Sequence, residues 1–305
     1  MPLASILARP QSTAPAPERE AELELPDGRR LSYALFGAPA GPLVVVLDGP
    51  GSRGLARVAG ARAEQLGLRL VAPDRPGFGA STQVDGDRIA AWPHDHRALL
   101  DALGADRAGI VAQSGGTPYA LAAAAALGAD RTTGLAFVAP IGPLAERAML
   151  ASSGTQVRRG AKLGRRAPWL LRLALAGAGR QAAKDPEKTA AKVAEGLPPR
   201  DEEIMRDPAN WAIHQRATVE ILSRPDAVAR EIARLAHPWN VDIGSIDVPV
   251  AFWSGDRDEV HPTSHARRIA ELLPGDPPVH VVAGAGTFGL MPRYGEALRF
   301  AAQLR

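Results

Sequence analysis

The chain of 305 residues contains no cysteine. This absence excludes disulfide bonds, thiolate zinc sites and a cysteine nucleophile, and it agrees with the cytoplasmic location that we expect. Long apolar runs are absent as well, since none approaches the ~20 residues that a membrane-spanning helix needs. The net charge of +3 is too small to predict binding to nucleic acid. We therefore expect a globular protein whose partner is a small-molecule substrate, and a homodimer is left open.

The first residues lack the features of a sorting signal. Residues 1–19 have neither a basic start nor an adequate apolar stretch, so we expect a disordered N-terminal tail. After this tail, alternating segments from Glu20 to Gly37 flank Pro26-Asp27-Gly28. Glycine accepts the positive φ of a tight turn, so this pattern predicts a β-hairpin.

Apolar strands then alternate with helical segments. Strands are predicted at Leu43–Leu47, Leu68–Ala72, Leu135–Ala139, Val248–Ser254 and Val279–Ala283, and helices at Leu55–Leu66, Ile89–Leu103, Ser264–Leu273 and Met291–Leu304. This alternation predicts an α/β fold with a mostly parallel, doubly wound sheet. Residues 143–240 show helical segments but no convincing strand. We therefore expect a core of residues 20–142 and 241–305, with a helical lid at 143–240 inserted between two late strands.

The segment Ala108–Ala126 carries the main chemical signal. Its apolar start ends in Gln113-Ser114-Gly115-Gly116, and an alanine-rich helical run follows at once. A strand, a tight turn with a serine at its tip and a helix form the layout of a nucleophile elbow. The helix would direct its free N–H groups at the serine oxygen.

Taken together, these motifs resemble the α/β-hydrolase superfamily, specifically its small, lidded, esterase-like members. The resemblance is carried by the elbow and by Pro50-Gly51-Ser52, the run from Asp74 to Ser81, Gly255-Asp256-Arg257-Asp258 and Gly284-Ala285-Gly286. It implies that Ser114 is the nucleophile and Asp258 the triad carboxylate, with Asp256 as the competing carboxylate. It also implies an oxyanion hole formed by the N–H groups of Gly49 and Gly115.

The chain departs from the family pattern at two positions. Where the resemblance implies the triad histidine, this chain has Thr287, whose hydroxyl cannot act as a base near neutral pH. Where the family usually has His-Gly before the first catalytic loop, it has Leu47-Asp48. A carboxylate at Asp48 would oppose an oxyanion unless it is protonated or turned away. Alternatively, Asp48 bonds its own loop backbone, as aspartates in turns do.

Two histidines are candidates for the missing base. His261 lies three residues after Asp258 in the same predicted loop, and the alternative for it is a capping or surface histidine. His214 belongs to the predicted lid and could point down into the pocket. The remaining predicted substrate-binding residues are Gln113, Phe78, Trp211, Trp239, Phe288 and Met291, although each aromatic side chain could also belong to the core.

The predicted lid also contains a basic, partly apolar stretch. Residues from Gln156 to Lys192 are rich in Arg and Lys, and an apolar stripe lies around Trp169 and Leu173. This pattern fits an amphipathic helix at an interface or a lid that attracts an anionic substrate. We favour a lid whose apolar side covers the pocket while its charges face water.

Three functions remain compatible with the sequence. Loss of the triad histidine favours a non-hydrolytic lyase, isomerase or cyclase that uses Asp48 as acid or base on a carbonyl-bearing, largely apolar substrate. The alternative is a carboxylester or thioester hydrolase that uses Ser114 and Asp258 with a displaced base such as His261. The third is a catalytically inactive binding protein. No metal or organic cofactor is implied, because the sequence has neither a metal-ligand cluster nor a dinucleotide fingerprint.

Overall fold

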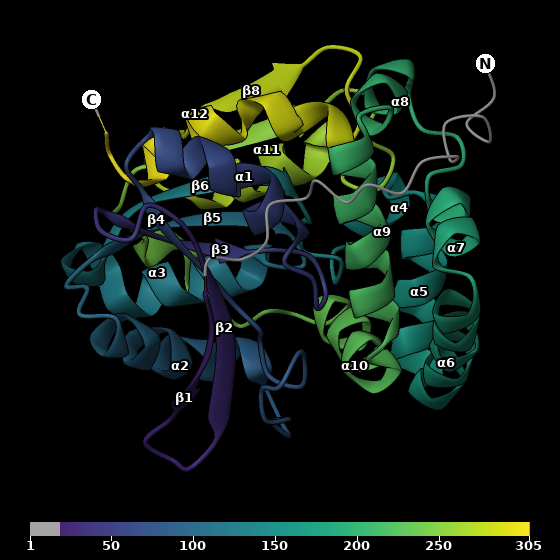
Figure 1. Cartoon of the computed structure of the whole chain (residues 1–305), viewed down its shortest axis with the longest axis horizontal. Coiled ribbons are helices and arrows are strands. Elements are labelled where there is room, and N and C mark those ends of the chain that lie inside the picture. The colour runs from purple at the N-terminus through teal and green to yellow at the C-terminus, as the bar shows by residue number, and fades with distance from the viewer. Residues whose placement is uncertain (1–18, 305) are drawn as a thin grey trace.

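The computed structural model describes residues 19–304, which form one eight-stranded sheet with helices around it (Figure 1). The strands are β1 (Arg19–Glu24), β2 (Arg30–Gly37), β3 (Leu43–Leu47), β4 (Arg69–Pro73), β5 (Ala108–Ser114), β6 (Thr132–Pro140), β7 (Val250–Gly255) and β8 (Val279–Val282). They lie in the order β1-β2-β4-β3-β5-β6-β7-β8. Strand β2 is antiparallel to both β1 and β4, whereas all other neighbours are parallel. The predicted mostly parallel α/β sheet is confirmed.

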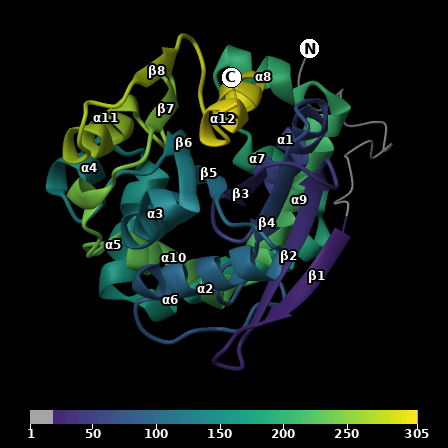
Figure 2. The same cartoon turned by 90° about the vertical axis from the view of Figure 1, so that its left-hand side faces the viewer.

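Helices cover both faces of this sheet. Helices α1 (Gly54–Gln65) and α12 (Tyr294–Ala301) pack on one face, and α2 (Arg88–Ala102), α3 (Thr117–Arg131) and α11 (Thr263–Leu272) pack on the other (Figure 2). In β3, Val45 belongs to the apolar cluster that includes α2 and α3, while Val44 and Val46 belong to the cluster that includes α1 and α12. Successive side chains of a strand point to opposite faces, so a continuous apolar run is buried on both sides.

Between β6 and β7 the described residues form helices and no strand. This stretch is called the helical insertion below. The helices are α4 (Arg147–Ser152), α5 (Thr155–Arg166), α6 (Pro168–Lys184), α7 (Pro186–Val193), α8 (Pro199–Met205), α9 (Pro208–Leu222), α10 (Pro225–Leu235) and the short η2 (Ile243–Ser245). Helices α6 to α10 all begin with proline, whose missing N–H would have no partner in a first turn. Figure 1 shows α5 to α10 gathered beside one end of the sheet.

The predicted elements differ from the structure mainly at their ends. The hairpin is present as β1 and β2, but β1 already begins at Arg19, which the sequence assigned to the tail. The rest of that predicted tail lies outside the described residues. The closing helix, predicted as one element from Met291, is divided into η3 (Phe288–Arg293), which contains Pro292, and α12. Proline lacks the N–H that a longer helix would use, which explains the division. Among residues 19–304, no helix has the length and apolar character needed to cross a membrane.

Candidate active site

Ser114 lies at the tip of a strained turn between β5 and α3. Its φ is +49°, a left-handed conformation that non-glycine residues rarely adopt. The turn is closed by the Gly116 N–H, which donates to the Gln113 carbonyl at 2.8 Å. A Cβ at Gly116 would come within 2.1 Å of the Leu47 carbonyl oxygen, so only glycine fits there. This geometry matches the predicted nucleophile elbow and exposes the Ser114 hydroxyl to the cavity described below.

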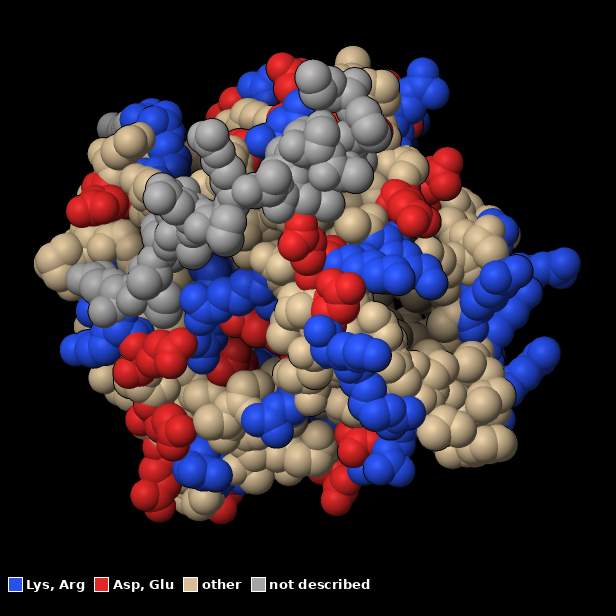
Figure 3. Space-filling model, turned by 45° about the vertical axis from the view of Figure 1, so that its right-hand side comes forward, with Lys and Arg blue, Asp and Glu red and all other residues tan. Residues whose placement is uncertain are grey.

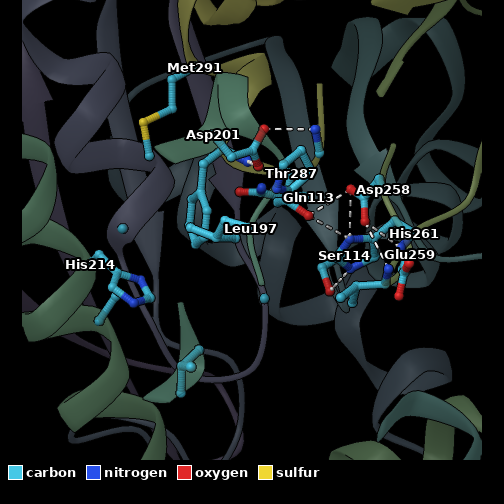
Figure 4. Close-up of a pocket in the computed structure, with 18 of the residues that line it drawn as sticks. Gln113, Ser114, Leu197, Asp201, His214, Asp258, Glu259, His261, Thr287 and Met291 are labelled. Atoms are coloured by element: carbon cyan, nitrogen blue, oxygen red, sulfur yellow. Dashed lines mark hydrogen bonds and ion pairs between the residues drawn. The ribbon is translucent and has the colours of Figure 1, made fainter. Parts of the chain in front are cut away.

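His261 reaches Ser114 from the loop that follows β7. Its Nε2 lies 2.8 Å from Ser114 Oγ, and the imidazole is buried (Figure 4). The loop is held by Asp258, whose Oδ1 accepts the backbone N–H groups of Val260 at 2.9 Å and His261 at 2.8 Å. This tight turn directs the imidazole back toward the elbow. The structure thus brings together Ser114, His261 and Asp258, and the histidine lies on the loop of the acid rather than after the last strand.

Thr287 occupies the space between Asp258 and His261. Its hydroxyl lies 2.6 Å from Asp258 Oδ2 and 3.2 Å from His261 Nδ1, while Nδ1 and Oδ2 are 3.4 Å apart. A carboxylate can only accept, so the Thr287 hydroxyl donates to Asp258 and its oxygen is left to accept from the imidazole. Both neighbours of Nδ1 can then only accept, so Nδ1 is assigned the proton and Nε2 is left to accept from the Ser114 hydroxyl. The imidazole N–H is therefore shared by the Thr287 oxygen and the carboxylate.

Asp258 is held in its charged form by these partners. Burial acts to raise the pKa of its carboxyl, but the electrostatic interaction with His261 and the hydrogen bonds from His261 and Thr287 outweigh burial and lower the pKa overall. A carboxylate that stays ionised can stabilise an imidazolium that forms beside it during proton transfer.

Asp201 of α8 fixes the loop that carries Thr287. Its side chain is fully buried, with Oδ1 2.7 Å from the Gly286 N–H and Oδ2 2.8 Å from the Phe288 N–H. A Cβ at Gly286 would come within 2.7 Å of Oδ2, so the missing side chain makes room for the carboxylate. Burial raises the pKa of Asp201 despite these backbone donors. A residue of the helical insertion thus positions the hydroxyl that contacts Asp258 and His261.

A second buried group connects the insertion to the loop beside Ser114. Arg75 donates to the carbonyls of Asp48 at 2.8 Å and Gly49 at 3.1 Å, and to Glu231 Oε1 of α10 at 2.7 Å. The other oxygen of Glu231 accepts the Tyr119 hydroxyl at 2.6 Å. Both members of the ion pair are buried, with Glu231 at 0% and Arg75 at 4% exposure. Every oxygen of the buried carboxylate therefore has a donor, as a buried charge requires.

The Ser114 hydroxyl opens into a cavity of about 1250 Å³ between the sheet edge and the insertion. Of the predicted substrate-binding residues, Gln113, His214, Phe288 and Met291 line it, and Figure 4 shows His214 and Met291 across the cavity from the Ser114 group. Apolar walls come from the core and from the insertion, with Leu55, Val58, Val157, Val193, Leu197, Ile213 and Ile221 among them. Burial lowers the pKa of His214, which favours its neutral form.

The sequence from residue 37 to 299 matches a family model described as "Alpha/beta hydrolase family". The chain belongs to this family of enzymes. Similar solved structures include an alpha/beta hydrolase fold protein from Nakamurella multipartita, with 21% identity and a TM-score of 0.68 over 94% of this chain and 98% of that one. An esterase from Rhodococcus sp. ECU1013 is 22% identical, with a TM-score of 0.67 over 93% and 98% of the two chains. An enol-lactonase from Burkholderia xenovorans LB400 is 19% identical, with a TM-score of 0.63 over 92% and 97%. These likenesses show a shared fold. A search of curated protein sequences gave no match.

Asp48 lines the cavity, and the structure bears on the two alternatives given for it. Its carboxylate accepts three donors, the Gly49 N–H at 2.6 Å, the Ser52 hydroxyl at 2.7 Å and the Leu55 N–H at 2.8 Å. These bonds hold the loop and the start of α1, which matches the alternative of an aspartate that bonds its own backbone. They leave no support in the geometry for Asp48 as an acid or base. The Gly49 N–H is engaged by Asp48, so its predicted oxyanion role is not supported either.

Three predicted aromatic residues do not line the cavity. Phe78 is buried in a small cluster with Ala227 and Val228, and Trp239 is part of the core below the sheet. Trp211 packs against His214, with ring centroids 5.4 Å apart, but is not itself in the wall. The three rings pack against other residues instead. Core packing stabilises an aromatic side chain as well as a position in a pocket wall does.

Sequence reasoning missed Asp201 and Tyr294. Tyr294 lines the cavity and bonds to Gln113, and burial raises the pKa of its hydroxyl. Asp201 has no local signal, since its partners lie 85 and 87 residues away in the chain. Within residues 19–304, no group of three or more His, Asp or Glu side chains could hold a metal ion.

Proposed function

We propose that this protein is a serine hydrolase that cleaves carboxylic esters or thioesters. Ser114 is the nucleophile, His261 the base and Asp258 the group that orients the base and stabilises its charged form. The observation that carries the proposal is the 2.8 Å separation of His261 Nε2 from Ser114 Oγ at the head of a large cavity. A nucleophile within hydrogen-bond reach of a base, which a third group orients in turn, is the arrangement that nucleophilic catalysis needs.

The reaction follows from the positions of these groups. Ser114 Oγ attacks the ester carbonyl carbon while its proton passes to His261 Nε2. The oxyanion is stabilised by the Gly115 N–H, which lies in the turn just before α3. The tetrahedral intermediate collapses when the imidazolium returns that proton to the departing alkoxide or thiolate. Water then enters, loses a proton to His261 and attacks the acyl-serine. The second collapse releases the carboxylic acid and restores the Ser114 hydroxyl.

Thr287 assists this cycle without acting as the base. In the proposed mechanism its oxygen accepts the imidazole N–H and its proton is donated to Asp258, with the distances of 3.2 and 2.6 Å given above. The hydroxyl thereby keeps the imidazole in the tautomer that can accept the Ser114 proton. The side chain that replaces the family histidine thus supports the histidine that works from another loop.

The contact between His261 and Ser114 removes the main argument for a non-hydrolytic enzyme. It was favoured because no base was expected at Thr287, and it assigned the acid or base role to Asp48. An imidazole within hydrogen-bond distance of Ser114 supplies a base, and the carboxylate oxygens of Asp48 are engaged by their own loop. The same imidazole weakens the case for an inactive binding protein, because a chain without catalysis has no need of an oriented base.

We also propose that helices α4 to α10 form a lid over the site. Residues of α5, α7, α8 and α9 line the cavity together with Ser114. Their apolar side chains favour an ester with an extended apolar group, since apolar surface is stabilised when it leaves water. The cytoplasmic location and the homodimer stay predictions from the sequence.

The proposed function is tested by replacing Ser114 with alanine. We expect wild-type protein to hydrolyse p-nitrophenyl esters and the variant Ser114→Ala to lose turnover by about 10⁴–10⁶-fold, as loss of a nucleophile does in serine hydrolases. The matched control Ser245→Ala removes an exposed hydroxyl on η2 and should keep wild-type turnover. Wild-type protein that is folded but hydrolyses neither esters nor thioesters would contradict the proposal.

The role of Thr287 is tested by Thr287→Val, which keeps the shape but removes the hydroxyl. Hydrogen bonds to charged groups contribute about 1.5–3 kcal/mol, so we expect kcat to fall about 10- to 100-fold with little change in KM. Thr287→Ser keeps the hydroxyl and should retain most of the activity. Steady-state kinetics on one ester measure both variants. If the serine variant were as slow as the valine variant, the hydroxyl would not be the contributing group.

A further inference from the structure

Helix α6 presents an apolar patch to solvent. Trp169, Leu170 and Leu173 of α6 are 68%, 40% and 58% exposed, whereas Leu171 of the same helix is buried. Residues one turn apart share one side of a helix, so Trp169 and Leu173 lie together, away from the packed side. We call these three residues the α6 patch. The fold does not need them for its core, and exposed large apolar side chains that gather in one place mark an interaction surface.

Positive charge surrounds the α6 patch. The chain contains Arg and Lys but no Asp or Glu from Thr155 to Lys184. Arg172, between Leu170 and Leu173, is exposed and pairs with the exposed Asp226 of α10. The next exposed cations along the chain on the N-terminal side are Lys162, Arg165 and Arg166 at the end of α5, and in the described part of the chain none of these three is in an ion pair. Figure 3, which brings the side of α5 and α6 forward, shows blue Lys and Arg side chains gathered at its right-hand edge beside tan surface of uncharged residues.

We propose that the α6 patch docks on the surface of an anionic lipid bilayer. A helix that combines exposed Trp and Leu with flanking Lys and Arg is suited to lie at a membrane interface, where apolar side chains enter the acyl boundary and cations meet anionic headgroups. A second copy of the chain is a less suitable occupant. In a two-fold dimer through this patch, Lys162, Arg165 and Arg166 would face the same charges of the other copy.

Docking there would place the cavity next to the bilayer. Thr155, Gln156 and Val157 at the start of α5 line the cavity, while the end of the same helix leads into the patch. Helix α5 therefore connects the docking surface to the site, and an apolar ester dissolved in the membrane would enter over a short path. The inference says where the proposed hydrolysis would take place. Binding of the α6 patch to a bilayer does not itself depend on the proposed function.

The test is flotation with phosphatidylcholine vesicles, with and without phosphatidylglycerol. The Ser114→Ala variant is used alongside wild type, so that hydrolysis does not affect binding. We expect both proteins to float with the anionic vesicles, not with the neutral ones, and to be released by salt. Each Lys or Arg near an anionic surface contributes about fivefold to binding. The triple variant Lys162→Gln, Arg165→Gln and Arg166→Gln should therefore bind about 100-fold more weakly.

Matched variants separate the α6 patch from charge in general. The control Arg97→Gln, Arg267→Gln and Arg299→Gln removes the same amount of charge from exposed positions on α2, α11 and α12. Its binding to anionic vesicles should differ from that of wild type only by the effect of the lower net charge. Trp169→Ser with Leu173→Ser should abolish flotation and keep hydrolysis of a water-soluble ester.

Three results would overturn the proposal. Wild type could fail to float with anionic vesicles, or it could float equally well with neutral ones. The Trp169 and Leu173 variant could bind vesicles normally but lose a dimer seen by light scattering, which would assign the patch to a second copy.

Discussion

Replacing His261 with alanine is expected to lower kcat/KM for an activated ester by about 10⁴–10⁶-fold. Among the described residues, the His261 imidazole is the only side chain that forms a hydrogen bond with Ser114 Oγ, at 2.8 Å. Without it the hydroxyl is an ordinary alcohol, and its proton has no acceptor as the ester carbonyl is attacked. The measurement is steady-state hydrolysis of a p-nitrophenyl ester, with folding checked by circular dichroism.

The control and the double variant sharpen this result. His237→Ala removes an exposed histidine outside the cavity wall and should leave kcat/KM unchanged. Residues that act as a unit are strongly non-additive, so Ser114→Ala combined with His261→Ala should be no slower than Ser114→Ala alone. A His261→Ala enzyme within tenfold of wild type would show that another group is the base.

The buried pair of Arg75 and Glu231 should dominate the stability of the region around the site. Glu231→Ala leaves the Arg75 guanidinium buried without its carboxylate, and breaking a buried ion pair in this way costs about 3–5 kcal/mol. It also removes the acceptor of the Tyr119 hydroxyl. We expect the free energy of unfolding, measured by urea denaturation, to fall by that amount.

An exposed ion pair provides the comparison. Glu271 pairs with Arg268 at the surface, and Glu271→Ala should change the free energy of unfolding by less than about 1 kcal/mol. Since Arg75 also holds the Asp48 and Gly49 carbonyls, Glu231→Ala should lower activity under conditions where the protein is still folded. Equal effects of the two substitutions on stability would contradict the importance of the buried pair.

The fold and the tight turn that carries Ser114 could be predicted because their signals are local. A continuous apolar run such as Leu43–Leu47 predicts a strand buried on both faces, and Gln113-Ser114-Gly115-Gly116 predicts a tight turn from its own residues. The carboxyl ends of parallel strands meet at one edge of a sheet, so loops that follow such strands lie close together. These expectations required only short stretches of sequence.

The contact between His261 and Ser114 could not be predicted from the sequence. His261 was a candidate because it follows Asp258 closely, yet its contact with Ser114 joins residues 147 positions apart. The same limit explains why Asp201 and Glu231 were missed, since their partners belong to distant elements. Phe78 and Trp239 were assigned to the pocket because residue type does not tell which side of an element a ring faces. For Asp48 the sequence left two alternatives open, and the contacts of its carboxylate agree with the one in which it bonds its own loop.

Covalent labelling of Ser114 tests the central claim most directly. Wild type, Ser114→Ala and His261→Ala are treated with a fluorophosphonate, and adducts are followed by intact-protein mass spectrometry and located by peptide mapping. The account predicts one adduct on Ser114 in wild type, none in Ser114→Ala, and labelling slowed by at least about 10³-fold in His261→Ala. Equal labelling rates in wild type and His261→Ala, or no labelling of folded wild type, would contradict it.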